Sequence, residues 1–202
     1  MVNSPSGIEG SLIHRPANIV EQLPLKKLFS TPGPLEVELG AGDGSFLIAY
    51  AQAHPETNFV GVERLLGRLR KIDRKARRAS LNNICLLRME ASYFVQYLVP
   101  RESVHSFHIY FPDPWPKRRH WKNRLITEAF TEILRAALVP SGTVYLRTDN
   151  GDYFEQMLAS FKTNLNFAKI ETPEKLLAFT TDFERGFHSQ GVPTLHASYR
   201  KQ

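Results

Sequence analysis

Cysteine is almost absent from this sequence, and its scarcity excludes several kinds of site. The 202 residues contain one cysteine, Cys85, so neither a disulfide framework nor a zinc site built on several cysteines is possible within the chain. Cys85 lies in the apolar run 84–87, which is typical of a buried strand, and we interpret it as a core residue rather than a nucleophile. The seven histidines are scattered without metal-ligand spacing. We therefore expect no metal ion.

Long apolar runs are also missing. A bilayer-spanning helix needs about 20 apolar residues, and no such window exists. The N-terminus lacks the charged segment followed by an apolar one that marks a signal peptide. We expect a cytoplasmic protein that does not enter a membrane. Its length and its 42% apolar content suit a single hydrophobic core. No feature of the sequence indicates an obligate protein partner. A monomer and a homodimer are both compatible with the sequence.

Positive charge is in excess and unevenly distributed. The formal net charge of +6 indicates a polyanionic partner. Between Arg64 and Arg78 there are eight basic residues and one acidic residue, Asp73. This distribution agrees equally well with a solvated helix face and with a helix that contacts RNA. A second basic cluster, from Lys117 to Arg124, includes Trp121 and begins two residues after Trp115, the other tryptophan of the chain. We expect this second cluster, Arg124 included, to neutralise RNA phosphates.

Strand and helix patterns alternate from residue 35 onward. Short apolar segments predict strands at 35–39, 58–63, 84–88, 106–111 and 143–147, and longer segments predict helices at 44–53, 65–81, 92–98, 125–138 and 152–161. This alternation is typical of right-handed βαβ units. We therefore predict an α/β fold with an open, mostly parallel, doubly wound sheet.

The two ends of the chain depart from this alternation. Segments 167–170 and 194–200 have the pattern of strands, and we expect the last one to run antiparallel. The interval between them is punctuated by prolines and glycines, which predicts a loop or short helices. Residues 1–34 contain five prolines and no convincing period. We expect an irregular N-terminal arm over 1–34, followed by one domain over 35–202.

A glycine-rich turn follows the first predicted strand, at the edge of the sheet where ligands of open α/β folds bind. Gly40, Gly42 and Gly44 leave room for a ligand to approach the backbone before the next helix begins. The dinucleotide fingerprint G-x-G-x-x-G would require its third glycine where this chain has Ser45. The turn therefore disfavours a dinucleotide, and taken alone it is also compatible with close packing and no ligand.

Acidic residues accompany that turn on three successive strands. Glu38 precedes the turn, Glu63 ends the second strand, and Glu90 follows the third. An acid at the place of Glu63 is suited to accept hydrogen bonds from ribose hydroxyls, and Glu90 is suited to reach an adenine amino group. Because acids rather than lysines gather here, we interpret the region as a pocket for S-adenosylmethionine, whose sulfonium group is cationic.

The fourth predicted strand runs into the segment Phe111 to Lys117. Prolines occupy every second position of this segment, 112, 114 and 116, and each one fixes φ and removes a backbone donor. The result is a stiff connection that holds its side chains in set directions. Asp113 is therefore expected to be held beside the donor pocket.

These motifs together carry a family resemblance. The sequences FPDPWPKRRHWKNRL, VELGAGDGSF, GVE, RTDN and TDFE resemble those of the bacterial tRNA guanine-N7 methyltransferase family, over about residues 35–202. The resemblance implies a Rossmann-like methyltransferase fold with S-adenosylmethionine as the methyl donor and tRNA as the partner. It also implies transfer to N7 of a guanosine, position 46 in the variable loop.

The family's functional residues fall on matching positions of this chain. The implied donor contacts are the glycine turn together with Glu38, Glu63, Glu90 and Asp113. Asp113 is also the implied catalytic residue. The implied substrate contacts are Lys117, Asp149, Thr181, Asp182, Phe183 and Glu184. Many members carry aspartate where this chain has Glu90. The charge at this position is the same, but the longer glutamate side chain changes the distance that the carboxylate can reach.

Guanine N7 is an acceptor without a proton, so methyl transfer to it needs no general base. Asp113 then has two possible roles, which the sequence leaves open. It stabilises the positive charge that develops on the purine, or it holds the guanine through its amino and imino protons.

Three other functions agree with parts of the sequence. A methyltransferase acting on an exocyclic base amine also places an acid, prolines and an aromatic after the fourth strand, but with Asp-Pro-Pro-Tyr rather than the Asp-Pro-Trp-Pro found here. A dinucleotide oxidoreductase conflicts with the glycine spacing. A non-catalytic RNA-binding module explains the charge but not the acids at the strand ends.

Replacement of Asp113 tests its role. We expect Asp113→Ala to lower turnover at least about a hundredfold, the scale of losing one electrostatic stabiliser. Turnover is measured with labelled donor and saturating RNA. Near-normal turnover in the variant would remove Asp113 from the mechanism.

Overall fold

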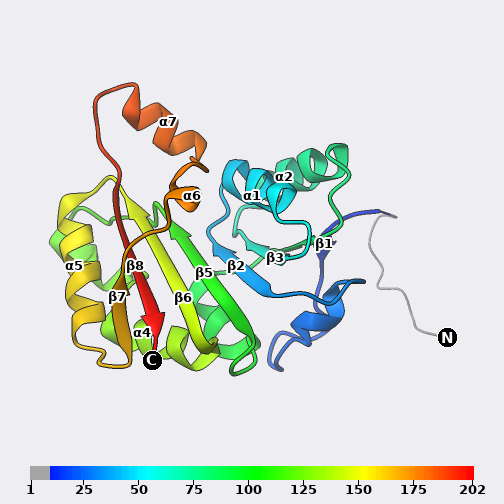
Figure 1. The fold of residues 1–202 in the computed structure, drawn as a ribbon, viewed down its shortest axis with the longest axis horizontal. Helices are drawn as coiled ribbons and strands as arrows, with labels where there is room; N and C mark the ends of the chain where they lie inside the picture. Colours follow the sequence, from blue (N-terminus) through cyan, green and yellow to red (C-terminus); the bar gives the residue numbers. More distant parts are fainter. Residues whose placement is uncertain (1–9) are drawn as a thin grey trace.

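An eight-stranded sheet forms the centre of the computed structural model, which describes residues 10–202 (Figure 1). Its strand order is β1-β4-β3-β2-β5-β6-β8-β7. The strands are β1 (Ile13–His14), β2 (Leu35–Leu39), β3 (Asn58–Val62), β4 (Ile84–Leu87), β5 (Val104–Tyr110), β6 (Leu138–Thr148), β7 (Phe167–Ile170) and β8 (Leu195–Lys201). β8 runs antiparallel to its neighbours β6 and β7, while the other pairings are parallel. The predicted fold class, including the antiparallel C-terminal strand, is confirmed.

Helices cover both faces of this sheet. They are α1 (Ser45–Ala53), α2 (Leu66–Arg78), α3 (Ala91–Tyr93), α4 (Glu128–Ala137), α5 (Gly151–Lys162), α6 (Glu174–Leu177) and α7 (Asp182–His188), with a π-helical turn η2 (Phe94–Leu98) and 3-10 turns η1 (Leu25–Leu28) and η3 (Arg118–Asn123). One apolar cluster joins α1 and α2 to β3 and β4. A larger cluster on the other face joins η2, α4 and α5 to the sheet. The alternation of elements predicted from the sequence is therefore a doubly wound arrangement.

Some element boundaries differ from the prediction for local reasons. The helix predicted from 125 begins at Glu128, because the Thr127 hydroxyl accepts a hydrogen bond from the Phe130 amide at 3.2 Å and so caps the helix there. β6 begins at Leu138 rather than at 143. Pro140 and a left-handed Ser141 interrupt the strand pattern, and a register shift in the pairing with β5 accommodates them.

The described part of the N-terminal arm packs against the domain. In the segment 10–34, β1 pairs with β4, with Ile13 opposite Leu86, and both Leu23 and Leu25 are buried in the main core. The amide of Leu23 also donates to the carbonyl of Leu98 at 2.8 Å. The part of the predicted arm over 1–9 lies outside the described residues. The division into an arm and a domain stays a prediction.

Side-chain alternation gives the central strands one apolar and one polar face. On β2, Leu35, Val37 and Leu39 enter the main core, whereas Glu36 and Glu38 point to the opposite face. Parallel register aligns further polar side chains of β5 and β6 with them. The resulting polar layer consists of Glu36, Glu38, His108, Tyr110, Tyr145 and Arg147. Helix α1 covers this layer through Phe46 and Tyr50. A buried polar layer therefore lies directly under the carboxyl end of the sheet.

Gly44 closes the glycine turn at the start of α1. Its φ of +77° is in the left-handed region, which favours glycine. A Cβ added there would lie 2.8 Å from Cγ1 of Ile72 on α2. The turn and α2 therefore meet at a distance that only glycine allows.

We expect Gly44→Ala to lower the free energy of unfolding by about 1–3 kcal/mol, because it combines overpacking with an unfavourable φ. Gly67→Ala is the matched control, since Gly67 lies in α2 and its added Cβ would meet no atom within 4 Å. That control is expected to change stability by less than about 1 kcal/mol. Urea titrations of both variants measure the difference, and equal stabilities would contradict the close approach of Ile72.

Candidate active site

Two adjoining cavities open at the carboxyl ends of the central strands. The larger, of about 510 Å³, contains Glu63 and Glu90 in its wall, and the smaller, of about 390 Å³, contains Glu38. Both are large enough for a small organic ligand. They share the lining residues Gly40, Arg68, Tyr110, Phe111, Pro112 and Asp113. Asp113 therefore lies at the junction of the two cavities.

The predicted site residues fall into two groups by their position relative to these cavities. Those that line one or both are Glu38, Gly40, Gly42, Glu63, Glu90, Asp113, Asp149, Thr181 and Phe183. Asp182 lines a third hollow between α7 and Asp43 of the glycine turn, which shares Phe183 and Phe187 with the smaller cavity. Gly44, Lys117 and Glu184 line none of these hollows. Most of the predicted set is thus brought together.

Glu63 holds the glycine turn in place. Its carboxylate accepts hydrogen bonds from the amides of Gly42 at 3.1 Å and Leu65 at 2.7 Å. The amides of Gly40 and Ala41 both donate to the carbonyl of Val62 at 2.9 Å. The turn is therefore fixed to the end of β3 by backbone and side-chain bonds, which pre-forms the wall shared by the two cavities.

Glu38 is buried beneath the same turn. Its side chain is only 4% exposed, and its Oε2 atom has no hydrogen-bond partner among the described residues. Burial, followed by the nearby charge of Asp43, raises the pKa of the Glu38 carboxyl well above its usual range, although Arg147 acts in the opposite direction. An unpaired buried carboxyl oxygen is costly, and a cationic ligand group in the smaller cavity would relieve that cost.

Glu90 has a different environment at the rim of the larger cavity. It is the N-cap of α3 and accepts bonds from the amides of Ser92 at 3.0 Å and Tyr93 at 2.7 Å. Partial burial raises the pKa of this carboxyl, but these hydrogen bonds outweigh burial and the net effect lowers it. Glu90 is therefore ionised and oriented at the cavity edge.

The proline-rich segment after β5 is held in a strained conformation. Phe111 has a φ of +50° and Trp115 a φ of +45°, which large side chains rarely adopt. Arg124 fixes this segment by donating from Nε to the carbonyl of Pro114 at 2.7 Å, and its guanidinium lies over the ring of Trp121 at 4.5 Å. Asp113 is thereby held at the junction of the two cavities.

The same bond corrects one expectation. Arg124 was expected to neutralise RNA phosphates, but it is only 3% exposed and its Nη1 also donates to Gln156 at 2.7 Å. Its charge is used inside the protein to brace the proline-rich segment. The neighbours Lys117, Arg118, Arg119 and Lys122 are exposed.

The segment Thr181–Glu184 forms the start of α7. Thr181 and Glu184 form a capping box, in which the Glu184 amide donates to the Thr181 hydroxyl at 3.0 Å. The Asp182 amide donates to the Ser45 hydroxyl at 2.9 Å, which ties α7 to the glycine turn. Phe183 is 49% exposed and lines the smaller cavity, whereas Glu184 is buried. Asp182 and Phe183 are therefore the exposed residues of this segment, while Thr181 is 7% exposed and borders the smaller cavity.

Arg147 is the functional residue that the sequence did not single out. It is 1% exposed, and it pairs with Glu184 at 2.9 Å while donating to the carbonyls of Leu176 and Phe179, each at 2.7 Å. Its guanidinium also lies over the ring of Tyr110 at 4.4 Å. Arg147 therefore attaches α6 and α7 to β6. Arg147 opens the RTDN sequence and alternates with the buried Leu146 and Thr148, a pattern that is equally typical of an exposed strand face.

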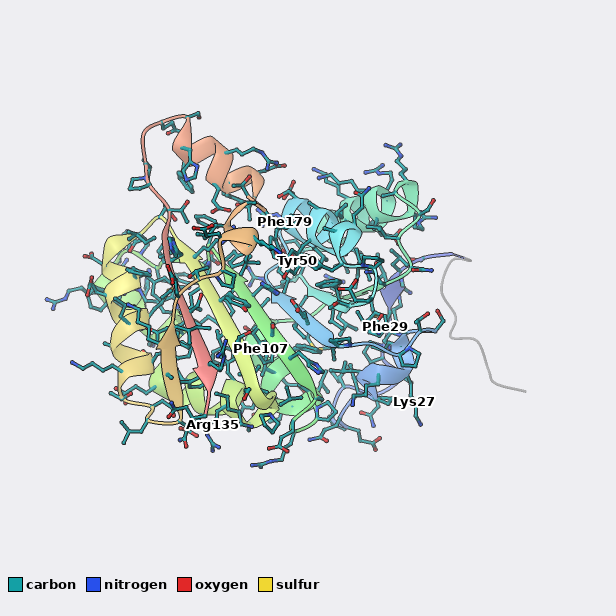
Figure 2. All side chains as sticks on the ribbon, viewed as in Figure 1. Lys27, Phe29, Tyr50, Phe107, Arg135 and Phe179 are labelled. Atoms are coloured by element: carbon teal, nitrogen blue, oxygen red, sulfur yellow. The ribbon has the colours of Figure 1, made fainter. Side chains whose placement is uncertain are left out.

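His108 connects the remainder of the polar layer. Its Nε2 lies 2.6 Å from Glu36 Oε2, and its Nδ1 lies 2.8 Å from the Tyr110 hydroxyl. Aromatic side chains cover His108 and its partners. Tyr50 of α1 packs against the His108 ring, and Phe179, which follows α6, meets Tyr50 edge to face with ring centroids 5.0 Å apart (Figure 2). His108 thus connects Glu36 to Tyr110 within the polar layer.

Several other classes of site receive no support in residues 10–202. Burial raises the pKa of the Cys85 thiol to about 12, which agrees with a core residue rather than a nucleophile. Within that range no group of three acidic, histidine or cysteine side chains is arranged to hold a metal ion. None of the helices described there is both long and apolar enough to cross a bilayer.

Comparison with known proteins identifies relatives. A family model described as "Putative methyltransferase" matches residues 32–197. A tRNA (guanine-N(7)-)-methyltransferase from Lactobacillus gasseri is 34% identical over 178 residues, which cover 82% of this chain and 81% of the relative. One from Thermotoga maritima is 34% identical over 176 residues, covering 87% of this chain, and the chain spans only 56% of that relative's length.

The fold also matches that of solved structures. The 16S rRNA methyltransferase KamB superimposes with a TM-score of 0.62 at 17% identity, covering 88% of this chain and 92% of KamB. At that identity the likeness establishes the fold alone.

The buried Glu38 carboxyl predicts a pH-dependent stability. Because its pKa is raised in the folded state, the folded protein keeps this proton while the unfolded chain loses it, so the Glu38 contribution to stability falls as pH rises above about 4.5, the ordinary value. Glu38→Gln cannot ionise. We expect it to be more stable than the unmodified protein at neutral pH, by about 1 kcal/mol or more, with the gain shrinking toward acid pH.

The same variant is expected to bind a cationic donor about tenfold or more weakly, the scale of one lost charge-assisted hydrogen bond. Urea titrations across pH and calorimetry with S-adenosylmethionine measure the two effects. Glu155→Gln, at an exposed position of α5, is the control and should change neither. Parallel pH profiles for Glu38→Gln and the unmodified protein would contradict the assignment.

Proposed function

Because this chain belongs to the family of tRNA (guanine-N(7)-)-methyltransferases, we propose that it transfers a methyl group from S-adenosylmethionine to N7 of a guanosine in tRNA. The observation that carries this proposal is the position of Asp113. It lies where a cavity lined by Glu63 and Glu90 meets one bordered by Thr181 and Phe183. One carboxylate thus adjoins both a donor-sized and a substrate-side cavity.

The donor residues have distinct proposed tasks. Glu63 accepts from the ribose hydroxyls and Glu90 from the adenine amino group, while Glu38 faces the cationic end of the donor. The unpaired oxygen and raised pKa of Glu38 support this last role, since a bound cation supplies the missing partner. Gly40 and Gly42 permit close approach to the backbone, and Gly44 sets the turn against α2.

The reaction needs positioning more than acid–base chemistry. The N7 lone pair forms a bond to the methyl carbon as the carbon–sulfur bond breaks, and the positive charge passes from sulfur to the purine. No proton moves, so no general base is required. Asp113 is exposed at the cavity junction, where it stabilises that charge or holds the guanine edge. Alignment of the two reactants contributes the remainder.

The substrate residues divide by their accessibility. Asp149, Thr181 and Phe183 line the smaller cavity and contact the guanosine, with Asp182 in the adjoining hollow beside Asp43. Lys117 is exposed after the proline-rich segment, where its charge suits a phosphate. Glu184 acts through Arg147, as a positioning residue for α7. We further propose position 46 in the variable loop as the target, and the cytoplasm as the place of action.

Chemical scission of the product tests the proposal. Purified protein with labelled donor is expected to methylate unmodified tRNA, and borohydride reduction followed by aniline should cut the product at one guanosine, because N7 methylation makes the ring labile. Mapping the cut by primer extension identifies the position. Incorporation without scission would indicate methylation of an exocyclic amine instead. Absence of both incorporation and donor binding would leave only an RNA-binding module.

A further inference from the structure

Helix α2 carries a row of basic side chains on its outer side. Its exposed basic residues at spacings of three and four, together with the one just before the helix, form what we term the α2 basic surface: Arg64, Arg68, Lys71, Arg74, Lys75 and Arg78. Residues three and four apart lie on one side of a helix, about 5–6 Å from each other. That spacing is comparable with the separation of successive phosphates in an RNA strand.

Acidic side chains do little to balance this surface. Asp73, the one acid in α2, is 7% exposed and turned inward, where it accepts from the Leu12 amide at 2.7 Å and pairs with Arg77 at 3.2 Å. Within residues 10–202, ion pairs are formed by Arg68 and Lys75 of the surface, whereas Lys71, Arg74 and Arg78 form none.

Lys75, Arg77 and Arg78 in the last turn of α2 suit the helix dipole, but two other features of the arrangement oppose helix stability. Lys71 precedes Lys75 by four residues, and Arg74 precedes Arg78 by four, so like charges repel along the helix. The first turn of α2 contains no acid, although the helix dipole favours one there. A surface that is unfavourable in the free protein is suited to a polyanionic partner that relieves the repulsion.

The α2 basic surface begins at the candidate active site. Arg64 and Arg68 line the larger cavity, and the 13 residues of α2 extend roughly 20 Å from there. Trp115 of the proline-rich segment and Asn123 of the basic cluster 117–124 line the same cavity. A nucleic-acid strand that crosses the cavity mouth would therefore meet basic side chains from both segments.

We propose that the α2 basic surface binds the sugar-phosphate backbone of the RNA substrate, beside the nucleotide that enters the active site. The contact is electrostatic and independent of base sequence. It serves to retain the RNA while the guanosine is positioned. This inference rests on the proposed function, and it adds a binding surface outside the cavities.

The test compares two variants of equal charge. The first, Lys71→Ala with Arg74→Ala and Arg78→Ala, removes three exposed cations that line neither cavity. The matched control, Lys162→Ala with Lys169→Ala and Arg200→Ala, removes three exposed cations from α5, β7 and β8, at the other end of the sheet (Figure 1). Both lower the net charge of +6 by three.

The α2 variant is expected to raise the Kd and KM for tRNA about tenfold or more near 0.15 M salt, with unchanged donor affinity and unchanged turnover at saturating tRNA. The slope of log affinity against log salt should become shallower by roughly 2–3, because about 0.7–0.9 is lost per phosphate contact. The control should behave as the unmodified protein does.

An unchanged tRNA affinity and salt slope in the α2 variant would overturn the inference, as would equal losses in both variants, which would indicate net charge alone. Failure of the proposed function looks different. In that case the unmodified protein itself would not methylate tRNA, whatever the state of α2.

Discussion

The buried ion pair between Arg147 and Glu184 is the interaction on which the α7 wall of the smaller cavity depends. Arg147 belongs to the sheet, and its other hydrogen bonds go to carbonyls of the α6 region. Removing one partner of such a pair typically costs 3–5 kcal/mol, since the other charge stays buried and unpaired. The start of α7, with Thr181 and Phe183, borders the smaller cavity because this pair fixes the helix there.

The polar layer links that pair to the larger cavity. Tyr110 lies under the guanidinium of Arg147, bonds to His108, and lines both cavities. Arg147 also lowers the pKa of Glu38 in opposition to the effect of burial. A charged ligand group bound beside Glu38 would therefore interact with Arg147, the residue of this layer that holds α7. The two halves of the site share one buried electrostatic environment rather than two separate ones.

The parts of this arrangement that the sequence predicts are those with a local signal. The apolar run at β2 and the glycine turn after it define a strand and a ligand-binding edge, and the alternating prolines define a stiff segment at Asp113. The polar layer has no such signal, because the alternation that places Glu36 and Glu38 opposite the core is also typical of an exposed face. Its burial follows from the packing of α1 above it. β1 is a two-residue strand without a period, and it exists only through pairing with β4. Arg124 lies within a basic run, and only tertiary contact with Pro114 distinguishes it from its exposed neighbours.

The position of β8 between β6 and β7 has a consequence for how the chain is made. β7 is synthesised before β8, yet in residues 10–202 its sheet pairing is with β8 alone. The strands β1 to β6 are complete by Thr148, and they form their parallel pairings with one another without β8. β7 gains a sheet partner only when residues 195–201 lie beside β6. Removal of β8 would therefore leave the edge of β6 unpaired and β7 without a strand partner, and both would be open to aggregation.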